Sequence, residues 1–265
     1  MAASPVTIGE LREGPLHAAL KRFYARPGDI VEAPLGGFVV DILRGERVIE
    51  IQTGGFHRMK AKLDALLDRH PMTIVHPLAV ERRIVRVDRD GEVLSARRSP
   101  LRASALAVCA ELVSFPVLLT HPHLTIEVAL CREDHVRAPE PVTRRGRRRD
   151  PGVRRLVEVV DRVVVAQPAD LGALLPGDLP ECFTTRELAR AARCGEVLAR
   201  QVLYCAREME IVVAAGRRGR APLYRRAYPP ASTPNSEVLV GALGGGAAVT
   251  GAGDEVVVGA SVGAG

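Results

Sequence analysis

The sequence of 265 residues lacks tryptophan altogether, and aromatic residues make up only 3% of it. No apolar run reaches the roughly 18 residues that a membrane-spanning helix needs. The first ten residues, MAASPVTIGE, lack the charged-then-apolar layout of a secretory signal. These absences predict a cytoplasmic protein with no membrane partner. The hydrophobic fraction of 47% supports a substantial core, which excludes a wholly disordered chain.

Cysteine and lysine are both scarce. The five cysteines are scattered with no CxxC pair, which predicts reduced thiols rather than a disulfide framework or a zinc site. Only three of the 37 basic residues are lysines, namely Lys21, Lys60 and Lys62. Residues 144–228 hold 18 arginines against 10 acidic residues, and the rest of the chain is slightly acidic. A basic module predicts a polyanionic partner, and an arginine-rich solvated surface is the alternative interpretation.

Hydrophobic periodicity divides the chain into helices and strands. The patterns predict helices over residues 7–25, 58–69, 105–119 and 154–165, and strands over residues 38–43, 48–53, 72–77, 82–87, 92–96 and 124–132. This order is typical of an α/β (α+β) fold, in which helices flank a mixed sheet.

The predicted hairpin over residues 38–53 carries the most informative side chains. A two-residue turn at Gly45-Glu46 would place Asp41 opposite Glu50, with Gln52 on the same face. Carboxylates placed opposite each other repel, and together with a carbonyl and water they suit Mg²⁺ or Mn²⁺. A one-residue slip in register would separate the two acids, and two solvated acids on a half-polar face is the alternative interpretation.

The hairpin also resembles a known superfamily. Asp41, then Glu50 and Gln52 on the next strand, after a helix carrying Glu13 and before a basic helix, resemble the PD-(D/E)XK nucleases. The resemblance implies an αβββαβ core, as in restriction endonucleases, that hydrolyses phosphodiester bonds. It also implies that Asp41 and Glu50 are metal ligands and that Glu13 is the acid contributed by the first helix.

Gln52 stands where this superfamily usually has lysine. Lysine can migrate within the superfamily, so Lys60 or Lys62 on the following helix would supply the missing charge. An ordinary solvated helix lysine is the alternative interpretation of Lys62. Residues 10–228 are also similar to an uncharacterised bacterial family with this nuclease-like core and a C-terminal helical module.

The C-terminal pattern is that of a winged helix. A capping box at Thr184 and Glu187 opens one helix, a second helix covers residues 196–210, and two strands follow around a basic loop. By similarity to winged helices, the predicted DNA-contacting residues are Arg200 and Gln201 in a major groove, and Arg217, Arg218 and Arg220 on the wing. Winged helices also dock proteins, which is the alternative for this module.

These patterns predict four segments. They are a nuclease-like domain at residues 7–137, a basic linker at 138–153, a winged-helix domain at 154–228 and a low-complexity tail at 229–265. The predicted function is a metal-dependent nuclease or a nuclease-like protein that binds nucleic acid, with DNA favoured over RNA and a homodimer as one assembly to test. The alternatives are a non-catalytic DNA-binding regulator with a degenerate core, and an adaptor. Arg97-Arg98-Ser99 could clamp phosphates or form a solvated loop.

Overall fold

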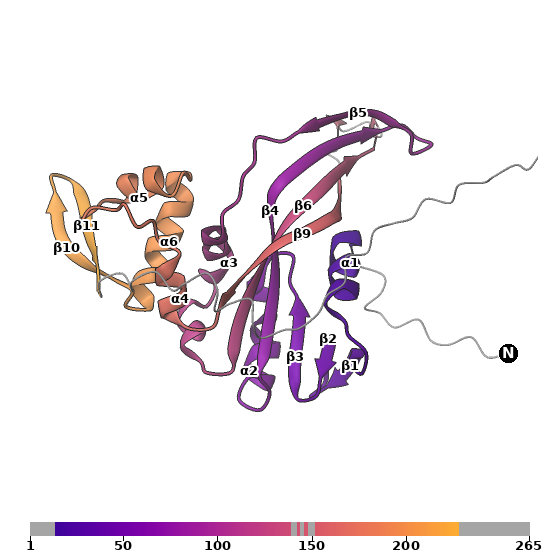
Figure 1. Ribbon diagram of the computed structural model, residues 1–265, viewed down its shortest axis with the longest axis horizontal. Coiled ribbons are helices and arrows are strands. Elements are labelled where there is room, and N and C mark those ends of the chain that lie inside the picture. Colours follow the sequence, from indigo (N-terminus) through magenta and orange to yellow (C-terminus); the bar gives the residue numbers. More distant parts are fainter. Residues whose placement is uncertain (1–13, 139–141, 144–145, 148–151, 228–265) are drawn as a thin grey trace, which may run out of the picture. The chain divides into compact units, whose positions relative to one another are not determined.

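Most strands of the protein join one seven-stranded mixed sheet (Figure 1). The computed structural model describes residues 14–138, 142–143, 146–147 and 152–227. The elements up to the middle of the chain are α1 (Pro15–Tyr24), β1 (Ile30–Leu35), β2 (Phe38–Arg44), β3 (Arg47–Ile51), the 3₁₀ turn η2 (Phe56–Met59), α2 (Lys60–Leu66), β4 (Met72–Val87), β5 (Val93–Arg98), η3 (Ala105–Val108), α3 (Cys109–Leu112) and η4 (Pro116–Thr120). The later elements are β6 (Leu124–Arg137), β7 (Val142–Thr143), β8 (Gly146–Arg147), β9 (Val153–Val165), α4 (Pro168–Ala173), α5 (Thr185–Ala191), α6 (Glu196–Glu208), β10 (Val212–Arg218) and β11 (Ala221–Arg226).

The sheet begins as an antiparallel meander and continues with parallel pairs. Its strand order is β1-β2-β3-β4-β6-β9, and β5 pairs with the outer half of β4. After β3 the chain crosses over through α2 and returns as β4, which lies parallel to β3 and to β6. The edge strand β9 is antiparallel to β6. The short strands β7 and β8 form a separate pair.

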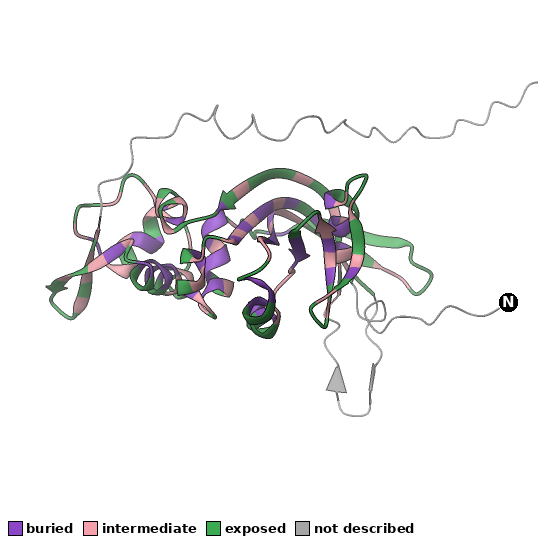
Figure 2. Ribbon diagram, turned by 90° about the horizontal axis from the view of Figure 1, so that it is seen from below, coloured by how far each residue is buried: buried purple, intermediate pink, exposed green. Residues whose placement is uncertain are grey.

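Helices cover the two faces of the sheet. On one face, α1 buries Leu16 and Leu20 against Ile42, Ile49 and Ile51. On the opposite face, α2 and the C-terminal helices share a second core, to which Leu63, Ile74, Leu112, Ile126 and Val202 belong. Figure 2 shows the buried segments within the sheet and its covering helices, with the hairpin ends exposed.

The C-terminal elements follow the order helix, bridge, helix, helix, strand, strand. Phe183 forms an isolated antiparallel bridge with Tyr224 on β11, after α4 and before α5. Thr184 caps α5 through the predicted box with Glu187, which confirms that part of the sequence pattern. Helix α6 packs on α3, where the Sγ atom of Cys205 lies 3.7 Å from the carbonyl oxygen of Cys109.

Four predicted elements were wrong in type or extent. Residues 154–165 form strand β9 rather than a helix, and they belong to the main sheet. Leu156, Val159 and Val163 mimic a helical spacing, but seven of the thirteen residues in β9 are valines, whose branched side chains favour a strand. The expected helix over 105–119 is broken into η3, α3 and η4, the last of which begins with Pro116.

The two strands expected over 72–77 and 82–87 are one strand, β4, which runs through Pro77. Proline lacks the amide that a sheet ladder needs and is normally excluded from central strands. Here β3 stops pairing with β4 at Val75, and β5 begins pairing at Arg83. Pro77 therefore pairs with β6 on one side and, within the described residues, has no ladder partner on the other.

The prediction of the hairpin turn is confirmed. The hairpin pairs Arg44 with Arg47 and Ile42 with Ile49, as the two-residue turn requires. All five cysteines are free thiols, and burial raises the pKa of Cys131 to about 12. No helix in the described part of the chain is long and apolar enough to cross a membrane.

Candidate functional site

Strand β2 twists sharply at Asp41. Val40 belongs to the core on the α2 side of the sheet, whereas Ile42 belongs to the core on the α1 side. Residues two apart share a face in a regular strand, so the strand rotates about Asp41. The Asp41 Oδ2 atom then accepts a hydrogen bond of 2.7 Å from the Ile51 amide. The carboxylate thus takes the place of a backbone carbonyl at the point where β2 and β3 stop pairing.

Helix α1 brings a histidine to this carboxylate. The His17 Nε2 atom lies 3.2 Å from Asp41 Oδ2. Burial acts to raise the pKa of Asp41, but the hydrogen bond and charge of His17 and the Ile51 amide outweigh burial, and the net pKa is lowered. Asp41 is therefore an anion at neutral pH.

Helix α2 brings a lysine to the second acid of the hairpin. The Lys62 Nζ atom donates to both Glu50 carboxylate oxygens, at 2.8 and 2.9 Å, and to the Val39 carbonyl oxygen at 2.8 Å. The Lys62 side chain is only 19% exposed and that of Glu50 8%. Burial raises the pKa of Glu50, against the lowering effect of Lys62. The interpretation of Lys62 as a solvated helix lysine is wrong. Lys60 fits that description instead, since it forms an exposed pair with Asp64.

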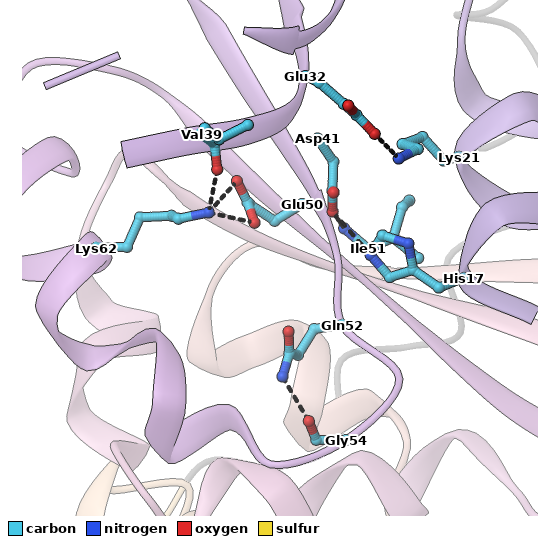
Figure 3. Close-up of polar contacts among 10 residues, drawn as sticks. All are labelled: His17, Lys21, Glu32, Val39, Asp41, Glu50, Ile51, Gln52, Gly54 and Lys62. Atoms are coloured by element: carbon cyan, nitrogen blue, oxygen red, sulfur yellow. Dashed lines mark hydrogen bonds and ion pairs between the residues drawn. The ribbon is translucent and has the colours of Figure 1, made fainter. Parts of the chain in front are cut away.

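The two acids of the hairpin are directed toward different helices, as Figure 3 shows. Asp41 meets His17 of α1, and Glu50 meets Lys62 of α2. The two carboxylates are nevertheless neighbours, since the charge of Asp41 acts to raise the pKa of Glu50. The alternative of two solvated acids is wrong, since Glu50 is buried and Asp41 is partly buried.

The Gln52 side chain points away from Asp41 and Glu50. Its Nε2 atom donates to the Gly54 carbonyl oxygen at 2.5 Å, so the side chain folds back on the loop after β3 (Figure 3). The Gln52 carbonyl oxygen accepts from His76 Nδ1 at 2.7 Å. Burial lowers the pKa of His76, which makes the neutral, singly protonated ring the favoured form.

A third acid–base pair lies beside the first two. The Lys21 Nζ atom donates to Glu32 Oε1 at 2.5 Å, and Glu32 has a left-handed backbone with φ of 54°. Sequence reasoning missed Glu32, Lys21 and His17. The signal was present: a Gly36-Gly37 hairpin turn sets the β1–β2 register, which places Glu32 opposite Asp41. Residues 17 and 21 are four apart and so share a face of α1.

Mg²⁺ and Mn²⁺ take hard oxygen donors, and the carboxylates of Asp41 and Glu50 have the right donor chemistry. Two carboxylates are fewer protein ligands than a metal site of three residues would supply. Within the described ranges, no group of three His, Cys, Asp or Glu residues is arranged to hold a metal ion. Glu13, the third acid that the nuclease resemblance implies, lies outside the described residues, as do residues 148–151 of the basic linker and the tail at 229–265.

The predicted DNA-contacting residues divide into two groups. Arg217 and Arg220 are exposed on the β10–β11 hairpin, and Arg200 is exposed on α6 within 3.8 Å of Glu196. Arg218 is also exposed but is paired, because its Nη1 atom donates to Glu187 Oε1 at 2.7 Å. Gln201 is half-buried on α6.

The chain is similar to one described protein family and to one bacterial protein. A domain described as "Domain of unknown function (DUF8091)" matches residues 14–166. The chain is also 30% identical, over 255 residues, to an uncharacterized protein of Treponema pallidum (strain Nichols), which covers 92% of this chain and 100% of the relative. No solved structure gives a significant match. The matched range ends at β9, the edge strand of the main sheet.

Proposed function

We propose that this chain, which belongs to the DUF8091 family, is a metal-dependent nuclease or a nuclease-like protein that binds nucleic acid. The proposal rests on the geometry of the hairpin and the helices beside it. The proposed reaction centre is the cluster of Asp41, Glu50 and Lys62. Three adjoining groups, one from each of β2, β3 and α2, supply two acids and a cation at the end of a hairpin.

The observation that carries the proposal is the contact between Lys62 and Glu50. In the PD-(D/E)XK pattern a lysine accompanies the acid of the third strand, and here Gln52 has replaced it. Lys62 reaches the same acid from the following helix, within 2.8 Å. The order α1-β1-β2-β3-α2-β4, with β4 parallel to β3, also agrees with the αβββαβ core.

Each residue has a role that its surroundings support. Asp41 and Glu50 would hold Mg²⁺ or Mn²⁺, and such an ion, when bound, polarises a phosphoryl oxygen and lowers the pKa of its water. Lys62 neutralises Glu50 and would place positive charge beside a scissile phosphate. His17 holds Asp41 in its anionic form and in a fixed orientation.

The C-terminal elements support a winged helix that presents the substrate. The Phe183–Tyr224 bridge supplies a short first strand, which completes the helix–strand–helix–helix–strand–strand order of that fold. Arg217 and Arg220 would contact phosphate from the hairpin, and Arg200 and Gln201 would face a groove. Because Arg218 is held by Glu187, its role would be to position the wing.

One specific arrangement favours a second candidate function. Glu32, Asp41 and Glu50 each already have a basic partner, and Gln52 is turned away from them. A core whose acids are all neutralised internally suits a non-catalytic DNA-binding regulator or an adaptor. That candidate keeps nucleic-acid or partner binding and has no dependence on a divalent metal.

Cleavage assays separate the two candidates. Purified full-length protein would be incubated with labelled duplex DNA, single-stranded DNA and RNA in Mg²⁺, Mn²⁺ or EDTA. The nuclease proposal expects metal-dependent cleavage that Glu50→Gln and Lys62→Gln abolish and that Lys60→Gln leaves intact. Binding without cleavage in either metal would support the regulator instead.

A further inference from the structure

Strands β4, β5, β6 and β9 extend beyond their covering helices as a sheet arm, defined here as residues 81–98, 132–137 and 153–158. The arm is rich in arginine on both faces, but the two faces differ in how that charge is neutralised. The α1-side face, named for its continuity with the core under α1, carries Arg82, Arg86, Arg97, Arg137 and Arg154. The far face carries Arg83, Arg98, Arg132 and Arg155.

Strand register and ion pairs fix this division of the faces. Arg82 is paired in register with Glu133 and forms an ion pair with it, so their side chains share a face. Side chains alternate along a strand, and therefore Arg86 and its register partner Arg137 lie on that face too. Arg97 joins them, since its partner Ile84 stands between Arg82 and Arg86 in the alternation.

The base of the α1-side face is a buried ionic clamp. Glu133 is 1% exposed. Arg154 donates to Glu133 Oε2 from Nε at 2.9 Å, and Arg82 reaches Glu133 Oε1 from the other side. One carboxylate thus serves two guanidinium groups, so the clamp has a net positive charge and holds both arginines in place.

Three exposed arginines surround this clamp. Arg86, Arg97 and Arg137 form no ion pair with any carboxylate in the described part of the chain. Arg86 and Arg137 are direct neighbours on adjacent strands. Like charges in that position destabilise a sheet, so the arrangement favours an external anion.

The far face of the same strands shows the opposite behaviour. Arg83 pairs with Asp134 at 2.6 Å, Arg98 with Glu81 at 3.5 Å, and Arg132 with Glu158 at 2.5 Å. Arg155, the register partner of Asp134, also lies on the far face and forms no ion pair in the described part of the chain. Three of the four far-face arginines are thus neutralised, against two of five on the α1-side face, where Arg82 and Arg154 share one carboxylate. The unneutralised charge is therefore concentrated on the α1-side face.

We infer that the α1-side face of the arm binds the phosphate backbone of duplex DNA. Neighbouring strands lie ~4.8 Å apart and alternate residues ~6.6 Å apart, so the exposed arginines form a dense cationic array. Duplex DNA carries one charge per ~1.7 Å of axis, a density that lets one short stretch meet all three arginines. This inference rests on the nucleic-acid part of the proposed function and is independent of catalysis.

The test compares two triple variants of the full-length protein. Arg86→Gln/Arg97→Gln/Arg137→Gln removes the exposed charges of the α1-side face. Arg83→Gln/Arg98→Gln/Arg132→Gln removes the same net charge from the far face. Fluorescence anisotropy with a labelled random-sequence 30-base-pair duplex is recorded from 50 to 300 mM salt, and thermal melting confirms that each variant is folded.

The inference expects the first triple variant to bind at least tenfold more weakly, with a salt slope reduced by about 0.9 per lost phosphate contact. The far-face variant should stay within about threefold of wild type. Equal weakening by both variants, or none by the first, would overturn the inference. If the first triple variant fails to fold, the single variant Arg97→Gln on edge strand β5 decides, with an expected slope reduction of about one.

Three further outcomes distinguish DNA binding by the arm from DNA binding by the wing, from catalysis and from membrane binding. If Arg217→Gln/Arg220→Gln weakens DNA binding and the arm variant does not, the arm inference fails while the proposed function stands. If no cleavage occurs but the arm variant still loses DNA binding, the arm inference stands without the nuclease. Arginine-dependent binding to phosphatidylserine vesicles, with no binding to duplex, would overturn the assignment of the partner.

Discussion

Lys62 holds both carboxylate oxygens of the buried Glu50, at 2.8 and 2.9 Å. The two residues are twelve positions apart in the chain and lie on α2 and β3. A buried carboxylate needs a compensating cation, and this lysine supplies it. In the proposed nuclease, the same contact would supply the charge that Gln52 does not provide.

Removing the lysine should destabilise the fold. Lys62→Met leaves Glu50 buried without a partner, a change that typically costs about 3 kcal/mol of unfolding free energy at neutral pH. Urea unfolding of the full-length protein measures it. Lys60→Met is the control, because the Lys60–Asp64 pair is exposed and such pairs contribute little. Equal losses in the two variants would contradict the assigned role of Lys62.

The two acids of the hairpin should give opposite pH dependences. The pKa of Glu50 is raised by burial, so its neutral form favours folding. Its contribution to stability is complete below the unfolded pKa of ~4.3 and is lost as pH rises through the folded pKa. The free-energy difference between wild type and Glu50→Gln should therefore fall as pH increases above ~4.3.

Asp41 should behave in the opposite way, since its pKa is lowered in the fold. Its contribution is present above the unfolded pKa of ~3.9 and is lost as pH falls through the folded pKa. The difference between wild type and Asp41→Asn should therefore shrink as the solution is acidified below ~3.9. Chemical denaturation at a series of pH values tests both variants, and slopes of the same sign would contradict the account.

The clamp in the arm should be a major source of local stability. Glu133→Gln leaves Arg82 and Arg154 without their shared carboxylate, and breaking a buried ionic group of this kind typically costs about 3–5 kcal/mol. The adjacent Asp134→Asn is the control, since its partner Arg83 is exposed, and it should change the unfolding midpoint only slightly. Comparable shifts in the two midpoints would remove the distinction between the clamp and the surface pair.

The wing arginines should separate into two kinds. Arg217→Gln and Arg220→Gln should weaken DNA binding and reduce the salt slope by about one each, with no change in melting temperature. Arg218→Gln should change the salt slope much less, because its guanidinium already pairs with Glu187, and it should lower the melting temperature only slightly, because that pair is exposed. Anisotropy and thermal melting on the same preparations measure both effects. Loss of stability in all three variants would mean that the wing arginines serve the fold.

Local patterns in the sequence were enough to predict the hairpin. The Gly45-Glu46 turn set the register that pairs Ile42 with Ile49, and Ile42, Ile49 and Ile51 are buried together as alternation requires. The twist at Asp41 could not be predicted, because it depends on which core each neighbouring residue enters. Val40 and Ile42 look equivalent in the sequence and pack on opposite faces.

The type of β9 and the choice between Lys60 and Lys62 could not be predicted, because both depend on contacts between residues far apart in the chain. The valine-rich segment at 153–165 has an ambiguous periodicity, and only its pairing with β6 decides in favour of a strand. Lys62 was one of two candidate lysines on the predicted helix, and nothing local distinguished it from Lys60. The selection came from the crossover of α2, which places Lys62 over the end of β3.

Isothermal titration calorimetry with Mn²⁺, on the full-length wild type, Glu50→Gln and Lys60→Gln proteins, tests the proposed metal site most directly, with a cleavage assay on the same preparations. We expect wild type and Lys60→Gln to bind the metal and to cleave nucleic acid in its presence, and Glu50→Gln to do neither. Metal binding that is identical in all three proteins, or absent from wild type, would contradict the proposed site.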